Sequence, residues 1–177
     1  MTKSKTKIVL DADVINHFIR GGKLDLLPKI FPNCQFVVLD VVKREIPDLL
    51  LSELMRQINL KKSFSEEVFG KTAAEKKEYA RLTASTGPAL GKGESACMVY
   101  CRFNNDVVGS SNTRDVTNYC EEHGITFLTT NDFLYYAIKN NLMTVNEAHS
   151  FIQVVISNGS NPKVEDFNTY ICTKIVE

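Results

Sequence analysis

The chain has 177 residues, enough for one domain with a sizeable core, and 44% of them are hydrophobic while 24% are charged. Its 21 Lys and Arg balance its 21 Asp and Glu, which excludes general attraction to nucleic acid through net charge but leaves room for a local basic patch. The sequence lacks the roughly 20 consecutive apolar residues that a membrane-spanning helix needs. The basic residues 1–7 precede too short an apolar run for a signal peptide, so we expect a soluble, cytoplasmic protein.

The cysteines support the same expectation. There are five, an odd number, and they are scattered: Cys34, Cys97, Cys101, Cys120 and Cys172. Cys97 and Cys101 are spaced as neighbours on one helix face and not as a CxxC ligand pair. We therefore expect reduced thiols, as in a cytosolic protein.

Short apolar runs alternate along the chain with segments of helical spacing. The apolar runs predict buried strands at 8–10, 35–39, 106–110 and 125–129. The helical patterns predict helices at 14–18, 23–30, 41–46 (capped by Asp40), 49–58, 73–83, 94–100, 116–123, 133–139 and 145–156. Breaks are expected at Gly21-Gly22, Pro32-Asn33, residues 85–88, a tight turn at 91–93, Gly124 and Asn158-Gly159. Residues 61–77 are polar and weakly patterned, and the tail 164–175 is ambiguous, with a pattern that fits a short helix and then a strand.

This alternation of strands and helices carries no hairpin signal between strands. It predicts an α/β protein, a three-layer α/β/α sandwich with a central parallel sheet. We expect a single domain over residues 1–177, in which residues from about 145 form a C-terminal helical extension.

Four acidic residues share one expected position, the carboxyl end of the sheet. They are Asp11 after the first strand, Glu45 on the helix after the second, Glu94 after the Gly-Lys-Gly turn, and Asp115 after the third strand. Open α/β sheets bind ligands at this edge. Clustered carboxylates raise one another's pKa unless a cation neutralises them, and hard oxygen ligands favour magnesium or manganese over zinc. A carboxylate-only metal site is typical of enzymes that cleave phosphodiesters with metal-activated water.

Each acid alone has a plainer interpretation. Asp11 after a strand is often a helix cap, although Asp13 could be that cap and leave Asp11 free. Glu45 could be a solvated helix residue, Glu94 could favour the helix dipole, and Asp115 could cap its own helix. The histidines (His17, His123, His149) do not occupy equivalent loops. The four acids together favour the metal site.

Two other functional classes fit parts of the sequence. Gly91-Lys92-Gly93 before a helix suggests a phosphate-binding loop, but the P-loop spacing and its Lys-Ser/Thr pair are missing. A receiver or phosphatase domain also places Asp after a parallel strand, but this chain has no suitable Lys after a late strand.

The motifs resemble those of PIN-domain ribonucleases, including the VapC-like toxins of toxin–antitoxin pairs. The resemblance runs from Ile8 to about Asp132. It rests on the order and spacing of Val-Leu-Asp-Ala-Asp, Lys-Arg-Glu-Ile, Gly-Lys-Gly-Glu-Ser-Ala and Ser-Asn-Thr-Arg-Asp, segments that contain Asp11, Glu45, Glu94 and Asp115 respectively.

The resemblance implies an acidic quartet of Asp11, Glu45, Glu94 and Asp115 around one or two Mg²⁺ or Mn²⁺ ions, with Asn112 as a polar supporting residue. Two features depart from the family pattern. Glu94 stands where the family often has Asp, and Asp13 stands where Asn, Ser or Thr is commoner, so Asp13 is a supporting candidate. Asp132 competes with Asp115 for the fourth place, and its other role is to cap the following helix.

Under this hypothesis Asp11, Glu94 and Asp115 hold the metal, and Glu45 binds it or orients water. The substrate is single-stranded or looped RNA, held by nearby basic residues: Lys43, Arg44, Lys92 and Arg114. The alternative is a catalytically inactive PIN-like module that binds a protein or RNA. The helices expected over 14–30 and 49–58 carry many apolar residues, which fits core packing, a homodimer face or a groove for an antitoxin.

Overall fold

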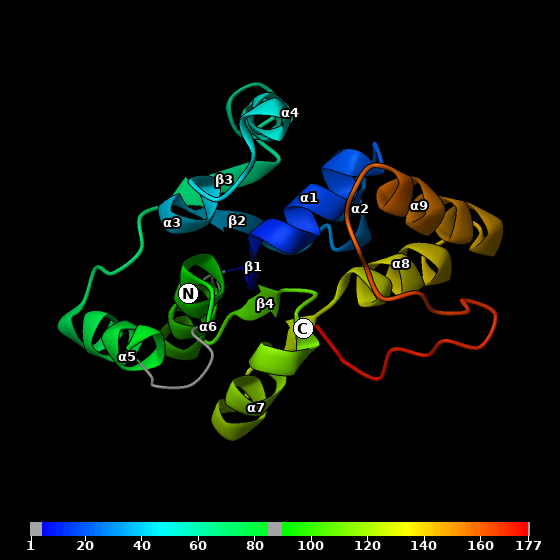
Figure 1. Ribbon diagram of the computed structural model, residues 1–177. Helices are drawn as coiled ribbons and strands as arrows, with labels where there is room; N and C mark the ends of the chain where they lie inside the picture. The colour runs from blue at the N-terminus through cyan, green and yellow to red at the C-terminus, as the bar shows by residue number, and fades with distance from the viewer. Residues whose placement is uncertain (1–4, 85–89, 177) are drawn as a thin grey trace.

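The computed structural model describes residues 5–84 and 90–176 (Figure 1). Most of the basic start, residues 1–4, and the break expected at 85–88 lie outside the described residues. In the described part of the chain, no helix is long and apolar enough to cross a membrane.

The centre of the fold is a sheet of five parallel strands in the order β3-β2-β1-β4-β5. The strands are β1 (Lys7–Leu10), β2 (Gln35–Leu39), β3 (Phe64–Glu67), β4 (Val107–Gly109) and β5 (Phe127–Leu128). The predicted parallel α/β architecture is confirmed. Strand β3, whose residues are Phe-Ser-Glu-Glu, was not predicted, because a strand at a sheet edge has only one paired neighbour and can be polar.

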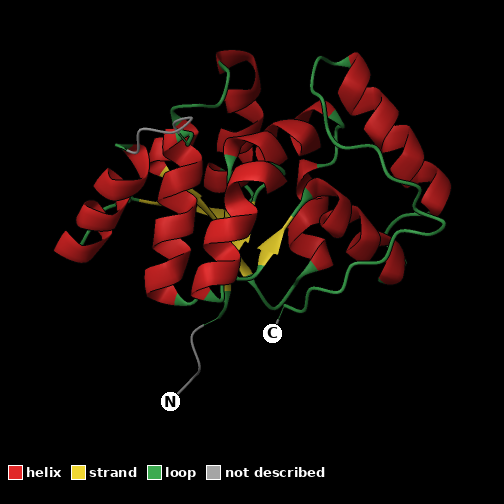
Figure 2. Ribbon diagram, turned by 60° about the horizontal axis from the view of Figure 1, so that its bottom comes forward, coloured by secondary structure: helices red, strands yellow, loops and turns green. Residues whose placement is uncertain are grey.

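Helices cover both faces of this sheet, as Figure 2 shows, with yellow strands between red helices. One side carries α5 (Ala73–Thr83), α6 (Lys92–Asn104) and α7 (Thr113–His123); the other carries α1 (Ala12–Arg20), η1 (Leu24–Leu26), α2 (Leu27–Ile30), α8 (Thr130–Lys139) and α9 (Val145–Ser157) (Figure 1). The remaining helices, α3 (Asp40–Lys43) and α4 (Asp48–Asn59), connect β2 to the edge strand β3. The three-layer sandwich is therefore observed.

Strand order determines where a ligand site can form. The chain runs from β1 outward to β2 and β3 on one side, then returns to β4 beside β1 and continues to β5. The direction of winding thus reverses between β1 and β4. Such a switch point opens a crevice beyond the carboxyl ends of the two strands. Leu10 pairs with Gly109 as the last register pair, so the residues after them, Asp11 and Ser110, begin that crevice.

Many apolar residues of the helices expected over 14–30 belong to the core. Val14, Ile15 and Phe18 of α1 are fully buried, and so is Leu27 of α2. The apolar side of residues 14–30 therefore packs inside the domain. By contrast, Leu49 in α4 is 92% exposed. The five cysteines are free thiols, as expected.

Several predicted boundaries were wrong. The helix expected over 41–46 is a single turn, α3, that begins at Asp40, and Glu45 lies in the turn after it. Asp40 is no cap: its side chain accepts the N–H of Phe69 at 2.9 Å and an Arg44 hydrogen bond at 2.7 Å. Lys92 already belongs to α6, so residues 91–93 are not a separate tight turn. The tail after α9 contains neither helix nor strand through residue 176.

The docking of α9 can be tested at Gly21, directly after α1. A Cβ atom on Gly21 would lie 2.1 Å from the ring of Phe151, which packs against Phe18 at a centroid distance of 5.1 Å. We expect Gly21→Ala to lower the free energy of unfolding by about 1–3 kcal/mol through overpacking. Phe151→Leu, destabilising alone, should cost less in the Gly21→Ala background, which a double-mutant cycle in urea would measure. Additive effects would contradict this packing.

Candidate functional site

Asp11 occupies the centre of the crevice between β1 and β4. Its backbone N–H donates to Gly109 O at 2.7 Å, which extends the sheet by one bond. It is the N-cap of α1, and its Oδ1 accepts the N–H of Ala12 at 2.8 Å, so the cap is Asp11 and not Asp13. Its side chain is buried, and burial followed by the charges of Asp13, Glu94 and Glu45 raises its pKa well above the usual value. The capping hydrogen bond from Ala12 lowers the pKa of Asp11, but burial and the neighbouring charges outweigh it.

Asp13 ties α1 to the loop after β4. Its Oδ1 accepts the N–H of Val14 at 2.6 Å, and its Oδ2 accepts the N–H of Ser111 at 2.9 Å. Burial raises the pKa of Asp13 to about 6, against the lowering effect of these backbone bonds. The Ser111 hydroxyl continues the network to Thr130 Oγ1 at 2.7 Å, which contacts His17 Nδ1 at 2.8 Å. Asp13 is thus held in place as a supporting residue of the crevice.

Glu45 reaches the site through the start of α6. The backbone N–H of Gly93 donates to Glu45 Oε1 at 2.9 Å. A Cβ atom on Gly93 would lie 2.4 Å from Glu45 Oε2 and 3.3 Å from Asp11 Oδ1. A side chain at position 93 would therefore push the end of the flexible Glu45 side chain away from its place beside Asp11.

Among Asp11, Glu45, Glu94 and Asp115, Glu94 is the most buried, with 3% of its surface exposed. Both its carboxylate oxygens are buried without a hydrogen bond of good geometry. Burial, then the charges of Asp115 and Asp13, raise the pKa of Glu94 to about 7, and weak contacts from Asn112 and Ser110 oppose the rise. A buried carboxylate with only weak hydrogen-bond contacts is costly in a folded chain unless a cation binds it.

Asp115 lies in the first turn of α7, half-buried, and its charge acts on Glu94. The side chain of Asn112 donates from Nδ2 to Asp115 Oδ2 at 2.8 Å, and the N–H of Asn112 donates to Ser110 Oγ at 3.3 Å. Asn112 therefore links Asp115 to the end of β4. Asp115 stands at the rim and not in the wall of the central hollow.

An open hollow of about 360 Å³ joins these residues, lined by Asp11, Ala12, Asp13, Asn16, Glu45, Gly91, Glu94 and Asn112. All the charged groups in its wall are acids. Oxygen donors of this kind suit Mg²⁺ or Mn²⁺, and the two unpartnered Glu94 oxygens fit such an ion. As the side chains lie in the described residues, no three His, Cys, Asp or Glu groups already converge in ligand geometry. The residues fit the ion by chemistry, and binding requires side-chain rotation.

No protein-family model matches the sequence, and the curated proteins contain no match either. Among solved structures, the chain resembles a chain of VapBC2 from Rickettsia felis bound to a DNA fragment from their promoter. The identity is 12% and the TM-score 0.50, over 70% of this chain and 98% of that one. The chain has a PIN-domain fold of the VapC-like type. A PilT N-terminus domain protein from Sulfolobus solfataricus P2 also aligns at 12% identity over 75% of this chain and 94% of that one, but its TM-score of 0.44 supports no argument.

Within this PIN-domain fold, Asp132 is engaged outside the hollow. It is the third residue of α8 in a capping box with Thr129, which donates its backbone N–H to Asp132 Oδ2 at 2.8 Å. Lys174 Nζ bonds Asp132 Oδ2 at 2.7 Å, and the Tyr170 hydroxyl donates to Oδ1 at 2.7 Å. Although burial opposes it, these bonds lower the pKa of Asp132. The capping role is observed.

The four basic residues named from the sequence divide into two pairs. Lys43 binds both oxygens of Glu66 at 2.7 Å, and Arg44 binds Asp40 at 2.7 Å, so both are occupied by intramolecular ion pairs. Lys92 and Arg114 are exposed at the starts of α6 and α7, beside Gly93 and Asn112 of the site. Lys92 and Arg114 are therefore the better-placed substrate contacts.

Some residues of the PIN-domain crevice were not predicted from the sequence. Asn16 lines the hollow, and its Oδ1 is buried without a hydrogen-bond partner. Its spacing of three from Asp13 on α1 was a usable signal, because residues i and i+3 share a helix face. Gly93, Ser110 and Ser111 gave no comparable signal, because their roles depend on the strand order.

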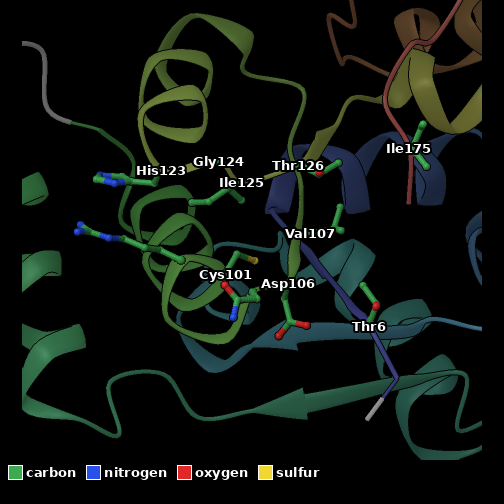
Figure 3. Close-up of a pocket in the computed structure, with 11 residues that line it drawn as sticks. Thr6, Cys101, Asp106, Val107, His123, Gly124, Ile125, Thr126 and Ile175 are labelled. Atoms are coloured by element: carbon green, nitrogen blue, oxygen red, sulfur yellow. The ribbon is translucent and has the colours of Figure 1, made fainter. Parts of the chain in front are cut away.

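A larger hollow of about 470 Å³ lies at the amino-terminal ends of the strands, opposite the acidic crevice (Figure 3). Asp106 and Val107 at the start of β4 border it, with Gly124 to Thr126 before β5. The acidic residues after the strands cannot reach it, because the whole length of the sheet intervenes. Volume alone does not locate the chemistry of this chain.

Proposed function

We propose that this chain is a magnesium- or manganese-dependent nuclease that hydrolyses phosphodiester bonds in RNA. The observation that carries the proposal is the acidic crevice at the switch point, where Glu94 holds two buried oxygens without partners beside Asp11 and Asp13. Together with a PIN-domain fold, such a crevice suits a metal-dependent hydrolase.

The residues have distinct roles in this proposal. Asp11, Glu94 and Asp115 would hold the metal, and Asp13 and Asn112 would support them through the loop after β4. Glu45 has one oxygen fixed by the N–H of Gly93, which leaves Oε2 to bind the ion or accept a proton from the attacking water. When bound, the ion lowers the pKa of water and stabilises charge on the phosphoryl oxygens.

The reaction in this proposal is a hydrolysis. A water oxygen attacks phosphorus in line with the leaving 3′-oxygen; the P–O3′ bond breaks, and a proton passes to that oxygen. The products carry a 3′-hydroxyl and a 5′-phosphate. Lys92 and Arg114, exposed beside the crevice, hold flanking phosphates of single-stranded or looped RNA.

A toxin role with an antitoxin partner extends the proposal. The similar chain from Rickettsia felis belongs to VapBC2, a complex described as bound to promoter DNA. In this chain, Leu49 at one end of α4 and Leu60 just after the other are 92% and 78% exposed. These leucines are the apolar surface that we assign to an antitoxin or to a second copy of the chain in a cytoplasmic homodimer.

Manganese binding measured by calorimetry tests the metal site. We expect stoichiometric binding to the unmodified chain and none to Asp11→Asn with Glu94→Gln, because two of the three proposed ligands lose their charge. The control, Asp48→Asn with Glu121→Gln, makes the same charge change at exposed positions of α4 and α7 and should bind normally. An unmodified chain that binds no manganese would favour the inactive module.

RNA cleavage tests the activity itself. With manganese, the unmodified chain and the control should shorten a labelled RNA, and the double variant should not. End analysis should find 5′-phosphates. Equal cleavage by the double variant would refute the assignment of Asp11 and Glu94.

A further inference from the structure

A second hollow, of about 130 Å³, lies beside the acidic crevice. Its wall is rich in hydroxyl groups and is lined by Ser111, Thr113, Thr129, Thr130, Asn131, Lys163, Glu165, Tyr170 and Lys174. Ser111 and Thr113 flank Asn112, which lines the acidic crevice, so one loop separates the two hollows. Whatever enters the second hollow lies next to the proposed cleavage site.

The C-terminal tail builds the outer wall of this hollow. Lys163, Glu165, Tyr170 and Lys174 all come from the segment after α9, which has no regular secondary structure. The tail is held to α8 at several points: Asn131 Nδ2 donates to Lys163 O at 3.0 Å, and Tyr170 and Lys174 bind Asp132. The wall is therefore fixed in position although it is irregular.

The groups in the wall match the chemistry of a nucleotide. Tyr170 is the one aromatic residue among those that line the hollow, and its hydroxyl is anchored on Asp132, so its ring is oriented. Aromatic side chains bind unpaired bases by stacking, and hydroxyl and amide groups bind base edges and the ribose 2′-hydroxyl. Lys163 is exposed and paired with Glu165 at 2.5 Å, so it would have to exchange that partner to contact a phosphate.

Asn131 provides a second, independent sign of a ligand. Its side chain is 5% exposed, and its Oδ1 is buried without a hydrogen-bond partner, although its Nδ2 is bonded to the tail. A buried amide oxygen without a donor is rare in a folded chain, because it loses the hydrogen bond that water would supply. Asn131 is among the residues that line the hollow, so the N–H group of a base bound there would supply the donor that this oxygen lacks.

We propose that this hollow receives one nucleotide of single-stranded RNA next to the phosphodiester that is cut, and that the C-terminal tail thereby selects the substrate. The proposal rests on the proposed nuclease function. It explains why the tail is tied to the start of α8, close to the crevice and on the same side as the loop after β4.

The test measures binding of fluorescein-labelled 12-nucleotide homopolymers of A, C and U to the full chain, with EDTA present to suppress cleavage. We expect Tyr170→Leu to weaken binding by about 5- to 150-fold, the effect of losing one stacked base. Tyr170→Phe keeps the ring but loses the hydroxyl bond to Asp132 that orients it, so it should weaken binding clearly less than Tyr170→Leu. If Tyr170→Phe loses as much affinity as Tyr170→Leu, the ring does not stack on a base and the proposal fails.

Lys163→Met is a second variant that does not disturb packing, because this side chain is exposed. It should weaken binding and reduce the salt dependence by about one phosphate contact. Lys139→Met is its matched control: it makes the same charge change at the far end of α8, away from the hollow, and should leave both unchanged. Equal effects of the two lysine changes would overturn the proposal.

The two proposals fail in different ways. Tail-dependent RNA binding without manganese-dependent cleavage would support the nucleotide hollow and refute the nuclease. If the chain cleaves RNA and its RNA binding does not change on substitution of Tyr170 or Lys163, the nuclease proposal is supported and the nucleotide-binding role of the hollow is refuted. An unmodified chain that binds none of the three RNAs would overturn the hollow.

Discussion

Replacing Gly93 with alanine is expected to lower manganese-dependent RNA cleavage by roughly 100-fold while the fold remains intact. The added Cβ would lie 2.4 Å from Glu45 Oε2 and 3.3 Å from Asp11 Oδ1, far inside the contact distance for the first. Glu45 must then move, and its bond with the Gly93 N–H is lost or bent. Misplacing one catalytic group by about 1 Å is enough for an effect of this size.

Gly91→Ala is the matched control, two residues earlier. A Cβ there would lie 3.7 Å from the Cβ of Glu94, an ordinary contact, and the backbone of Gly91 (φ −55°, ψ 143°) suits alanine. This variant should cleave RNA like the unmodified chain. Thermal unfolding should show both variants folded, because alanine favours the helix interior at position 93 and costs only up to about 1 kcal/mol at position 91, the N-cap of α6. Full activity in Gly93→Ala would show that Glu45 takes no part in the reaction.

Local features of this chain could be predicted from its sequence, whereas contacts between distant residues could not. The strands at 8–10 and 35–39 were predicted because a strand buried on both faces is apolar throughout, a property visible in a few residues. The acids Asp11, Glu94 and Asp115 were found for a related reason: each follows a predictable strand or begins a predictable helix. Their roles remain proposals, but their proximity follows from the parallel sheet.

The order of the strands could not be predicted from the sequence, and much of the site depends on it. That β4 pairs with β1, and so brings Ser111 to Asp13, is a contact across 98 residues. The need for glycine at position 93 arises from Glu45, which is 48 residues away. Likewise, the tail reaches Asp132 through Tyr170 and Lys174, and neither residue lies in a pattern with a period. Periodicity reports which face of an element is buried but not which element covers it.

Without metal, Glu94→Gln is expected to stabilise the chain at pH 8 by up to about 3 kcal/mol, or about 6–12 °C in melting temperature. Burial and the neighbouring Asp115 and Asp13 raise the pKa of Glu94 from 4.5 to about 7. A group whose folded pKa is raised stabilises the fold below its unfolded pKa and loses that stabilisation as the pH rises through the folded pKa. The stability of the unmodified chain should therefore fall between pH 4.5 and about 7 relative to the Gln variant.

The difference between variants, and not the profile of one chain, isolates this effect. His17 acts with the opposite sign: burial and Arg20 lower its pKa from 6.5 to about 4, so its stabilisation is present above pH 6.5 and is lost as the pH falls toward 4. Both variants contain His17, so its contribution cancels in the difference. Glu121→Gln, an exposed change in α7, is the control and should alter stability little at any pH.

Manganese should reverse the order of stabilities. An ion bound by Glu94 compensates the buried charge, so at pH 8 added manganese should raise the melting temperature of the unmodified chain more than that of Glu94→Gln. Chemical denaturation from pH 5 to 8, with EDTA and then with manganese, measures both effects. A Glu94→Gln chain no more stable than the unmodified one at pH 8 would mean that water or a rotated side chain already solvates Glu94. The carboxylate would then need no cation to compensate its charge, and the metal-site assignment would lose its main support.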